Sequence, residues 1–250
     1  FPIMVELHGG AWVRGDRQNG NAANEALAKN GVIVAALDFR VPPAAPYPAS
    51  LADIHCGIRW CKTQAPAWNG RPDRIGAMGT SSGAHQAMLL GMRPRDPRYA
   101  ALPLAEAPGL DATVNYVATR SPISDPYARV QQAEKMQRAE MVQNTKNWFI
   151  PWETIHEANP QEILERREKV SLPPLLIMQG ELDDNVLPAV QRKFAETYRK
   201  AGGDCRYELF EKSEHEWTGK PGPQTTRAHE MVKAFIARNV NAPEARKPRG

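Results

Sequence analysis

Short apolar runs alternate along the chain with longer segments in which apolar residues recur every three or four positions. The runs are typical of strands buried on both faces of a sheet, and the longer segments are typical of amphipathic helices. The predicted strands are residues 2–7, 31–38, 74–78, 112–118, 175–179 and 205–210. Because strands and helices alternate from one end to the other, the pattern predicts an α/β fold with a mostly parallel sheet flanked by helices.

Two segments depart from this alternation. Residues 125–170 have a helical, charged pattern with interspersed Met, Trp and Phe, and we expect them to form a helical cap inserted into the domain. Residues 241–250 are polar and rich in proline and charge, which is typical of a flexible tail. Phe1 is not an initiator residue and the chain opens directly on a strand, so we expect further residues upstream. Residues 1–250 are otherwise predicted to form a single domain.

Composition narrows the classes of function. The longest apolar runs fall well short of the roughly 20 residues that a membrane-spanning helix needs, so we expect no integral membrane segment. The net charge of +4 comes from scattered Lys and Arg with no basic stripe, and we expect no nucleic-acid partner. Cys56 and Cys61 point in different directions on one predicted helix. Free thiols favour a cytoplasmic location, while a signal upstream of Phe1 would change it.

A candidate nucleophile lies in the sequence GTSSG, which follows a predicted strand and precedes helix-compatible residues. A strand that turns abruptly into a helix needs small residues two before and two after the central residue, and Gly79 and Gly83 meet that need. The turn would lift the Ser81 hydroxyl above the sheet edge at the helix N-terminus, so we predict Ser81 as the nucleophile. An ordinary glycine turn is the alternative. Ser82 does not occupy the central position of the motif, and His85 is expected to pack against the sheet or the pocket floor.

The first predicted strand runs directly into the sequence HGGAW. Two adjacent glycines allow the backbone to turn its N–H groups toward one point, and together with the Ser82 N–H these donors would hold an oxyanion. Gly9 and Trp12 are candidate substrate contacts, although Trp12 fits core packing equally well. A plain strand-to-loop turn is the alternative interpretation. We favour this alternative for His8, whose imidazole would hydrogen-bond to nearby backbone and so stiffen the loop.

A candidate acid follows the predicted strand 175–179, in the sequence GELDDNV. Active sites of open α/β sheets collect at the carboxyl ends of the strands, so Asp183 is placed to orient a histidine. Asp184 is the second candidate. Acidic turns are also common as solvated loops, which is the alternative for both residues.

The general base is expected after the acid, because the chain order for this kind of elbow is serine, acid, histidine. His215 and His229 satisfy that order. His229 belongs to a predicted amphipathic helix, whereas His215 follows the strand 205–210 in a loop that can reach over the sheet edge. We therefore predict His215 as the base. His55 and His156 precede the acid and receive no role.

Metal chemistry is not expected. The histidines have no pair at a metal-binding helical spacing, and the sequence contains no Cys-x-x-Cys motif. We predict neither a metal nor any other cofactor.

Together these motifs resemble the esterase and lipase branch of the α/β hydrolases, which includes hormone-sensitive-lipase-like and feruloyl-esterase-like enzymes. HGGAW is similar to the His-Gly-Gly-Gly-type motif of that branch, LDFRVPPAAPYP to the segment before the elbow, and PDRIGAMGTSSGAH to the elbow itself. QGELDDNV looks like an acid turn that prolyl peptidases share. The resemblance covers nearly the whole chain and implies the α/β-hydrolase fold. It also implies that further N-terminal strands lie upstream of Phe1.

The resemblance also implies roles by position. The implied triad is Ser81, Asp183 and His215, and the implied oxyanion donors are the N–H groups of Gly10, Ala11 and Ser82. Ala11 stands where the family has a third glycine. This substitution keeps the N–H but narrows the space beside it.

These features predict a serine hydrolase that cleaves small-molecule carboxylic esters through an acyl-enzyme intermediate. An amidase, such as an arylformamidase or a small peptidase, is one alternative, because the same triad serves both bonds. A noncatalytic α/β-hydrolase-like binding protein is another, although such proteins usually lose a triad member. The physiological substrate and the oligomeric state are left open by the sequence.

Overall fold

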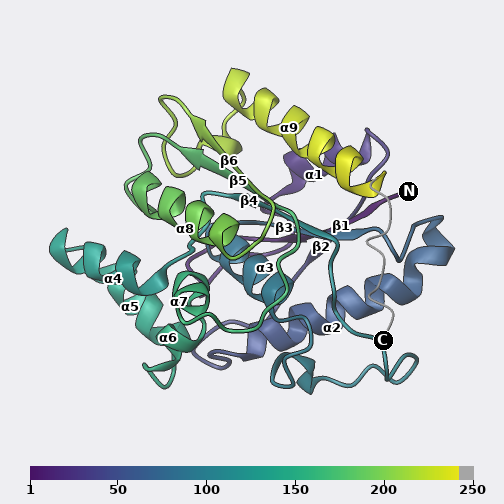
Figure 1. The fold of residues 1–250 in the computed structure, drawn as a ribbon, viewed down its shortest axis with the longest axis horizontal. Helices are drawn as coiled ribbons and strands as arrows, with labels where there is room; N and C mark the ends of the chain where they lie inside the picture. Colours follow the sequence, from purple (N-terminus) through teal and green to yellow (C-terminus); the bar gives the residue numbers. More distant parts are fainter. Residues whose placement is uncertain (242–250) are drawn as a thin grey trace.

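A six-stranded parallel sheet forms the centre of the computed structural model, which describes residues 1–241 (Figure 1). The strand order is β2-β1-β3-β4-β5-β6, and every neighbouring pair is parallel. The strands are β1 (Ile3–Leu7), β2 (Ile33–Leu37), β3 (Ile75–Thr80), β4 (Tyr116–Arg120), β5 (Leu175–Gly180) and β6 (Cys205–Phe210). The predicted α/β class is therefore confirmed, with the carboxyl ends of the strands at one edge.

The fourth strand was predicted wrongly at both ends. It was expected at 112–118 and lies at Tyr116–Arg120. The Asp111 carboxylate accepts the Thr113 N–H at 3.0 Å, which holds the chain in a local turn before β4 begins. The apolar pattern of the sequence does not show that the Asp111 side chain competes with the sheet for a backbone N–H group.

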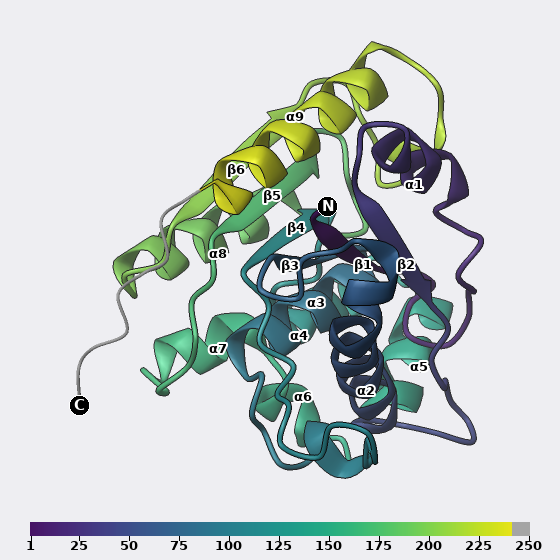
Figure 2. The same cartoon turned by 90° about the vertical axis from the view of Figure 1, so that its right-hand side faces the viewer.

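Helices cover both faces of the sheet, as Figures 1 and 2 show from two sides. Alternate residues of each strand point to opposite faces, so Ile3 and Val5 join one core cluster and Met4 joins the other. The helices α1 (Asn21–Ala28) and α9 (Pro223–Val240) cover the Met4 face. The opposite face is covered by α2 (Ala49–Gln64), α3 (Ser82–Met92) and α8 (Pro188–Lys200).

The chain between β4 and β5 is helical, in the segment expected to be a cap. Its helices are α4 (Pro126–Lys135), α5 (Ala139–Trp148), α6 (Thr154–Glu157) and α7 (Pro160–Glu165). Helix α7 contacts α3 and α8, so this segment is attached to the body of the domain. Short 3₁₀ helices elsewhere are η1 (Ala65–Trp68), η2 (Tyr99–Ala101) and η3 (Trp217–Gly219).

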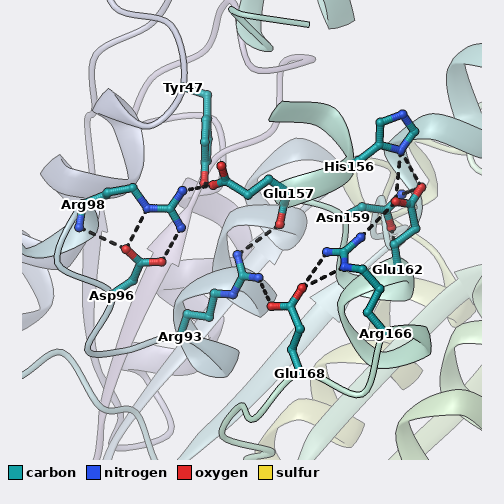
Figure 3. A network of polar contacts seen from close by, with 10 residues as sticks. All are labelled: Tyr47, Arg93, Asp96, Arg98, His156, Glu157, Asn159, Glu162, Arg166 and Glu168. Carbon is teal, nitrogen blue, oxygen red and sulfur yellow. Dashed lines mark hydrogen bonds and ion pairs between the residues drawn. The ribbon is translucent and has the colours of Figure 1, made fainter. Parts of the chain in front are cut away.

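A polar network ties α6 and α7 to the loop after α3 (Figure 3). Glu157 accepts hydrogen bonds from the Tyr47 hydroxyl at 2.5 Å and from Arg98, and its backbone carbonyl accepts one from Arg93 at 3.0 Å. The network continues through the side chains of Asp96, Glu168, Arg166, Glu162, His156 and Asn159. Contacts between segments so far apart in sequence hold this region in one arrangement.

The sequence also led to expectations about membrane-spanning helices, the cysteines and the C-terminal tail. Within residues 1–241, no helix combines the length and the apolar content needed to cross a membrane. Cys56, Cys61 and Cys205 are free thiols. The predicted tail at 241–250 lies outside the described residues apart from Asn241.

Candidate active site

Ser81 lies at the sharp turn between β3 and α3. Its φ of 54° and ψ of −117° fall outside the regions that most residues adopt, and its side chain is held at the first turn of the helix. The two glycines of the motif are required by backbone contact. A Cβ at Gly79 would lie 2.4 Å from the Gly83 carbonyl carbon, and one at Gly83 would lie 2.2 Å from the Leu7 carbonyl oxygen. The local sequence therefore has the geometry of a nucleophile elbow.

His215 bridges the serine and the acid. Its Nε2 lies 3.0 Å from Ser81 Oγ, and its Nδ1 lies 2.8 Å from Asp183 Oδ2. Because an ionised carboxylate only accepts, these partners assign the proton to Nδ1 and leave Nε2 as the acceptor for the serine hydroxyl. The structure thus brings together three side chains that the sequence places on separate strand ends.

Asp183 is buried and heavily hydrogen-bonded. Its Oδ1 accepts the backbone N–H groups of Asn185 and Val186 at 3.0 and 2.9 Å, and its Oδ2 accepts the Gln179 amide at 3.0 Å as well as His215. Burial opposes ionisation of the carboxyl, but the hydrogen bond and charge of His215 and the backbone donors outweigh it, so the pKa of Asp183 is below its usual value. The carboxylate is ionised and fixed in orientation.

The loop that carries His215 is built onto the end of β5. The Leu182 N–H donates to the Ser213 carbonyl at 2.9 Å, and the Ser121 hydroxyl donates to the His215 carbonyl at 3.3 Å. A Cβ at Gly180 would lie 2.5 Å from the Ser213 carbonyl oxygen. The histidine loop and the acid turn are therefore in direct backbone contact.

The alternative candidates for the acid and the base, Asp184 and His229, lie away from the Ser81 hydroxyl group and its hydrogen-bond partners. Asp184 faces Arg138, with an exposed side chain. His229 belongs to α9 and lines a small cavity with Arg120 and Met78 on the other face of the sheet. His55 is buried against the Pro94 carbonyl, and His156 pairs with Glu162 in the network of Figure 3.

His85 is a core residue. Its Nε2–H donates to the Ala158 carbonyl at 2.7 Å, and its Nδ1 accepts the Trp12 indole N–H at 3.1 Å. Burial lowers the pKa of His85 to about 4, so the imidazole is neutral at pH 7. His85 was expected to pack against the sheet or the pocket floor; it is buried, and its hydrogen-bond partners are Trp12 and the Ala158 carbonyl.

The HGGAW loop passes beside the serine. Gly10 has a φ of 118°, and a Cβ there would lie 2.0 Å from the Arg14 carbonyl oxygen, so the turn requires glycine at this position. Ala11 also has positive φ, at 53°. Gly9, Gly10 and Ala11 line the same cavity as Ser81. His8 bonds the Gly9 carbonyl through Nδ1 at 2.8 Å and stacks on Phe39.

Trp12 requires a correction. It was a candidate substrate contact, but its side chain is only 1% exposed and stacks on Trp148 with ring centroids 5.4 Å apart. Phe149 packs against the edge of this pair. The indole anchors the HGGAW loop in the core through contacts with aromatic residues at the end of α5, a segment distant in sequence.

A cavity of about 600 Å³ opens over Ser81 and His215. One wall is formed by Arg129 of α4 and by Asn185, neither of which was predicted from the sequence. The sequence does contain a signal for Arg129. This arginine lies at helical spacing among the buried positions Pro126, Val130 and Ala133 of α4, on a face where an exposed charge is not expected.

Known proteins with similar sequences include esterases. The BD-FAE family model matches residues 1–198. The esterase LipC of Mycobacterium tuberculosis (strain ATCC 25618 / H37Rv) is 30% identical over 203 residues, which is 79% of this chain and 48% of LipC. A probable isoprenylcysteine alpha-carbonyl methylesterase of Arabidopsis thaliana, ICMEL1, is 24% identical over 86% of this chain and 45% of its own length. The chain thus spans about half the length of the curated relatives it matches.

Among solved structures, the butyrate-bound esterase Est2 of Thermogutta terrifontis superimposes with a TM-score of 0.75. It is 21% identical, and the match covers 100% of this chain and 86% of Est2. The paraoxon-phosphorylated form of the same esterase gives a TM-score of 0.74 at 22% identity, over 97% of this chain and 85% of that one. These likenesses confirm the predicted α/β-hydrolase fold.

Proposed function

The chain belongs to the BD-FAE family, and from that membership we propose that it is a serine hydrolase that cleaves carboxylic esters. The observation that carries the proposal is the position of His215, whose ring nitrogens lie 3.0 Å from Ser81 Oγ and 2.8 Å from Asp183 Oδ2. This is the hydrogen-bonding order that activates a serine in acyl transfer.

The reaction proceeds in two steps. His215 Nε2 takes the proton of Ser81 as Oγ attacks the ester carbonyl carbon, and the resulting tetrahedral intermediate collapses when the alcohol leaves with that proton. Water then gives its proton to His215, attacks the acyl-enzyme and releases the carboxylic acid with restoration of the Ser81 hydroxyl. Asp183 stabilises the imidazolium in both steps and keeps its charge.

The developing oxyanion would be held by the N–H groups of Gly10, Ala11 and Ser82. The Ser82 N–H belongs to the first turn of α3, where backbone donors have no acceptor within the helix. The same helix end carries a partial positive charge that favours an anion. Gly9 would lie along the substrate, since it lines the cavity beside Ser81.

The segment 125–170 would act as a cap over this site. Arg129 of α4 contributes to the cavity wall, and the end of α5 holds Trp12 beneath the oxyanion loop. The relatives named as esterases support a small-molecule ester as the substrate.

The direct test is hydrolysis of p-nitrophenyl acetate by the wild-type protein and by Ser81→Ala. Loss of the nucleophile is expected to lower kcat by at least about 1000-fold. Ser171→Ala, which removes a hydroxyl from the loop before β5, is the matched control and is expected to retain wild-type turnover. Near-wild-type turnover by Ser81→Ala would refute the assignment. Parallel rates on N-formylkynurenine and dipeptide arylamides distinguish an esterase from an amidase.

A further inference from the structure

Arg129 is a buried cation in the wall of the Ser81 cavity. Its side chain comes from α4, and the residue is only 7% exposed. It lines the same cavity as Ser81 and His215. The guanidinium also lies over the Trp12 ring, 5.6 Å from its centroid, beside the oxyanion loop. Arg129 is therefore held rigidly next to the site where an ester would react.

The hydrogen-bond partners of this guanidinium are neutral. Its Nε and Nη2 donate to Asn185 Oδ1 at 3.0 and 2.7 Å, and its Nη1 donates to Thr145 Oγ1 at 3.5 Å. Burial lowers the pKa of Arg129 to about 10, against the opposing attraction of Asp183, so the group is still charged at pH 7. Both Nη atoms carry two N–H groups, and the partners above use one of each. A buried charge without a hydrogen-bonded counter-ion is costly to keep.

Most other charges around the cavity have partners of opposite sign. Arg14 pairs with Glu140, and Lys220 pairs with Glu214. Deeper in the cavity, Glu6 and Arg120 attract one another within the sheet. Glu216 lies at the exposed rim. Asp183, whose charge attracts Arg129, is already hydrogen-bonded to His215.

We propose that Arg129 binds a carboxylate of the substrate, so that the preferred esters carry a free carboxylate on the acyl or the alcohol side. This inference rests on the proposed ester hydrolysis and specifies its substrate class. A guanidinium with N–H groups still available is suited to a carboxylate, since the pair is planar and its hydrogen bonds are charge-assisted. Anchoring of the acid turn through Asn185 is the structural alternative, and it would affect all esters alike.

Two matched pairs of esters test the proposal. Mono-p-nitrophenyl adipate against p-nitrophenyl hexanoate places the carboxylate on the acyl side, and 4-acetoxybenzoate against 4-acetoxybenzamide places it on the alcohol side. For each pair, kcat and KM are measured for the wild-type protein, Arg129→Gln and Lys220→Gln. The last variant is the control, because it removes one positive charge from the rim of the same cavity.

In at least one pair, Arg129→Gln is expected to lower the ratio of kcat/KM for the carboxylate ester to that for its neutral partner by about 10- to 100-fold, chiefly through KM. Lys220→Gln is expected to change that ratio less than about 3-fold, since its charge is exposed and paired. Should Arg129→Gln not fold, Arg129→Lys is expected to lower the same ratio by a smaller factor, because lysine keeps the charge but not the planar fork.

The inference fails if Arg129→Gln lowers both members of each pair by the same factor, or if Lys220→Gln changes the ratio as much as Arg129→Gln. A wild-type protein that hydrolyses none of the four esters would instead contradict the proposed function, and this inference with it.

Discussion

The backbone of Gly180 lies directly against that of Ser213, so that a Cβ at Gly180 would be 2.5 Å from the Ser213 carbonyl oxygen. Gly180 ends β5 just before the acid turn, and Ser213 precedes His215 in its loop. The position of the His215 loop relative to the turn that carries Asp183 therefore depends on the absence of a side chain at Gly180.

Gly180→Ala is expected to displace the histidine loop. A misplacement of about 1 Å at a reacting group can cost about 100-fold in rate, so kcat for p-nitrophenyl acetate is expected to fall by about 10- to 100-fold. Gly109→Ala is the control, because nothing lies within 4 Å of its Cβ position. Equal turnover by the two variants would show that the contact does not position His215.

Asp183→Asn is expected to lower kcat by about 1000- to 10000-fold, because an amide can hold the imidazole in the wrong tautomer and no longer stabilises its charged form. Asp184→Asn is the neighbouring control. Its carboxylate faces Arg138 with 64% of the side chain exposed, and a change of less than about 3-fold is expected. If Asp184→Asn were the slower enzyme, the acid would have been assigned to the wrong residue.

His85 is expected to make stability depend on pH. Burial lowers its pKa from 6.5 to about 4 in the folded protein, so the folded state resists protonation more than the unfolded chain does. The stability contributed by the neutral ring is fully present above pH 6.5 and is lost as the pH falls toward 4, by an amount on the order of 3 kcal/mol.

Urea unfolding of the wild-type protein and His85→Gln at pH 7 and pH 4.5 measures this contribution. Glutamine can both accept from Trp12 and donate to the Ala158 carbonyl, but it does not titrate. The variant is expected to lose less stability over this pH range than the wild type. Equal losses would mean that His85 protonation does not contribute to acid unfolding.

Tyr47→Phe tests the network that holds α6 and α7. The hydroxyl bonds Glu157 and Tyr99 at 2.5 and 3.0 Å in a buried setting, so its removal is expected to lower the free energy of unfolding by about 1–2 kcal/mol. Tyr207→Phe removes a half-buried hydroxyl that donates to the Pro188 carbonyl at 3.3 Å, and it is expected to cost less. If Tyr207→Phe lowered the free energy of unfolding more than Tyr47→Phe, the network would not stabilise α6 and α7 as described.

The elbow could be predicted because local backbone contacts fix the residue types there, and the approximate positions of the strands could be predicted from their apolar runs. At Gly79 and Gly83 the backbones of β3, α3 and β1 approach so closely that side chains are excluded, and this requirement is visible in the sequence. The strands buried on both faces are likewise visible as apolar runs. These features depend on neighbours in sequence or on the simple alternation of the sheet.

Trp12 and Arg129 could not be assigned in the same way, because their surroundings come from distant segments. Trp12 is surrounded by Trp148 and Phe149, and Arg129 donates hydrogen bonds to Asn185, which lies 56 residues further along the chain. The type of a residue does not predict which distant element of the chain will pack against it. The start of β4 was missed for a different reason, since the Asp111 side chain competes locally with the strand.

Covalent labelling by paraoxon is the most direct measurement of the central claim, that Ser81 is a nucleophile activated by His215. Attack of Ser81 Oγ on phosphorus would release p-nitrophenol and leave a diethylphosphoryl group on the serine. We predict one adduct per chain, on the peptide that contains Ser81, with none on Ser81→Ala and strongly slowed labelling of His215→Gln. An unmodified wild-type protein, or an adduct that persists in Ser81→Ala, would contradict the account.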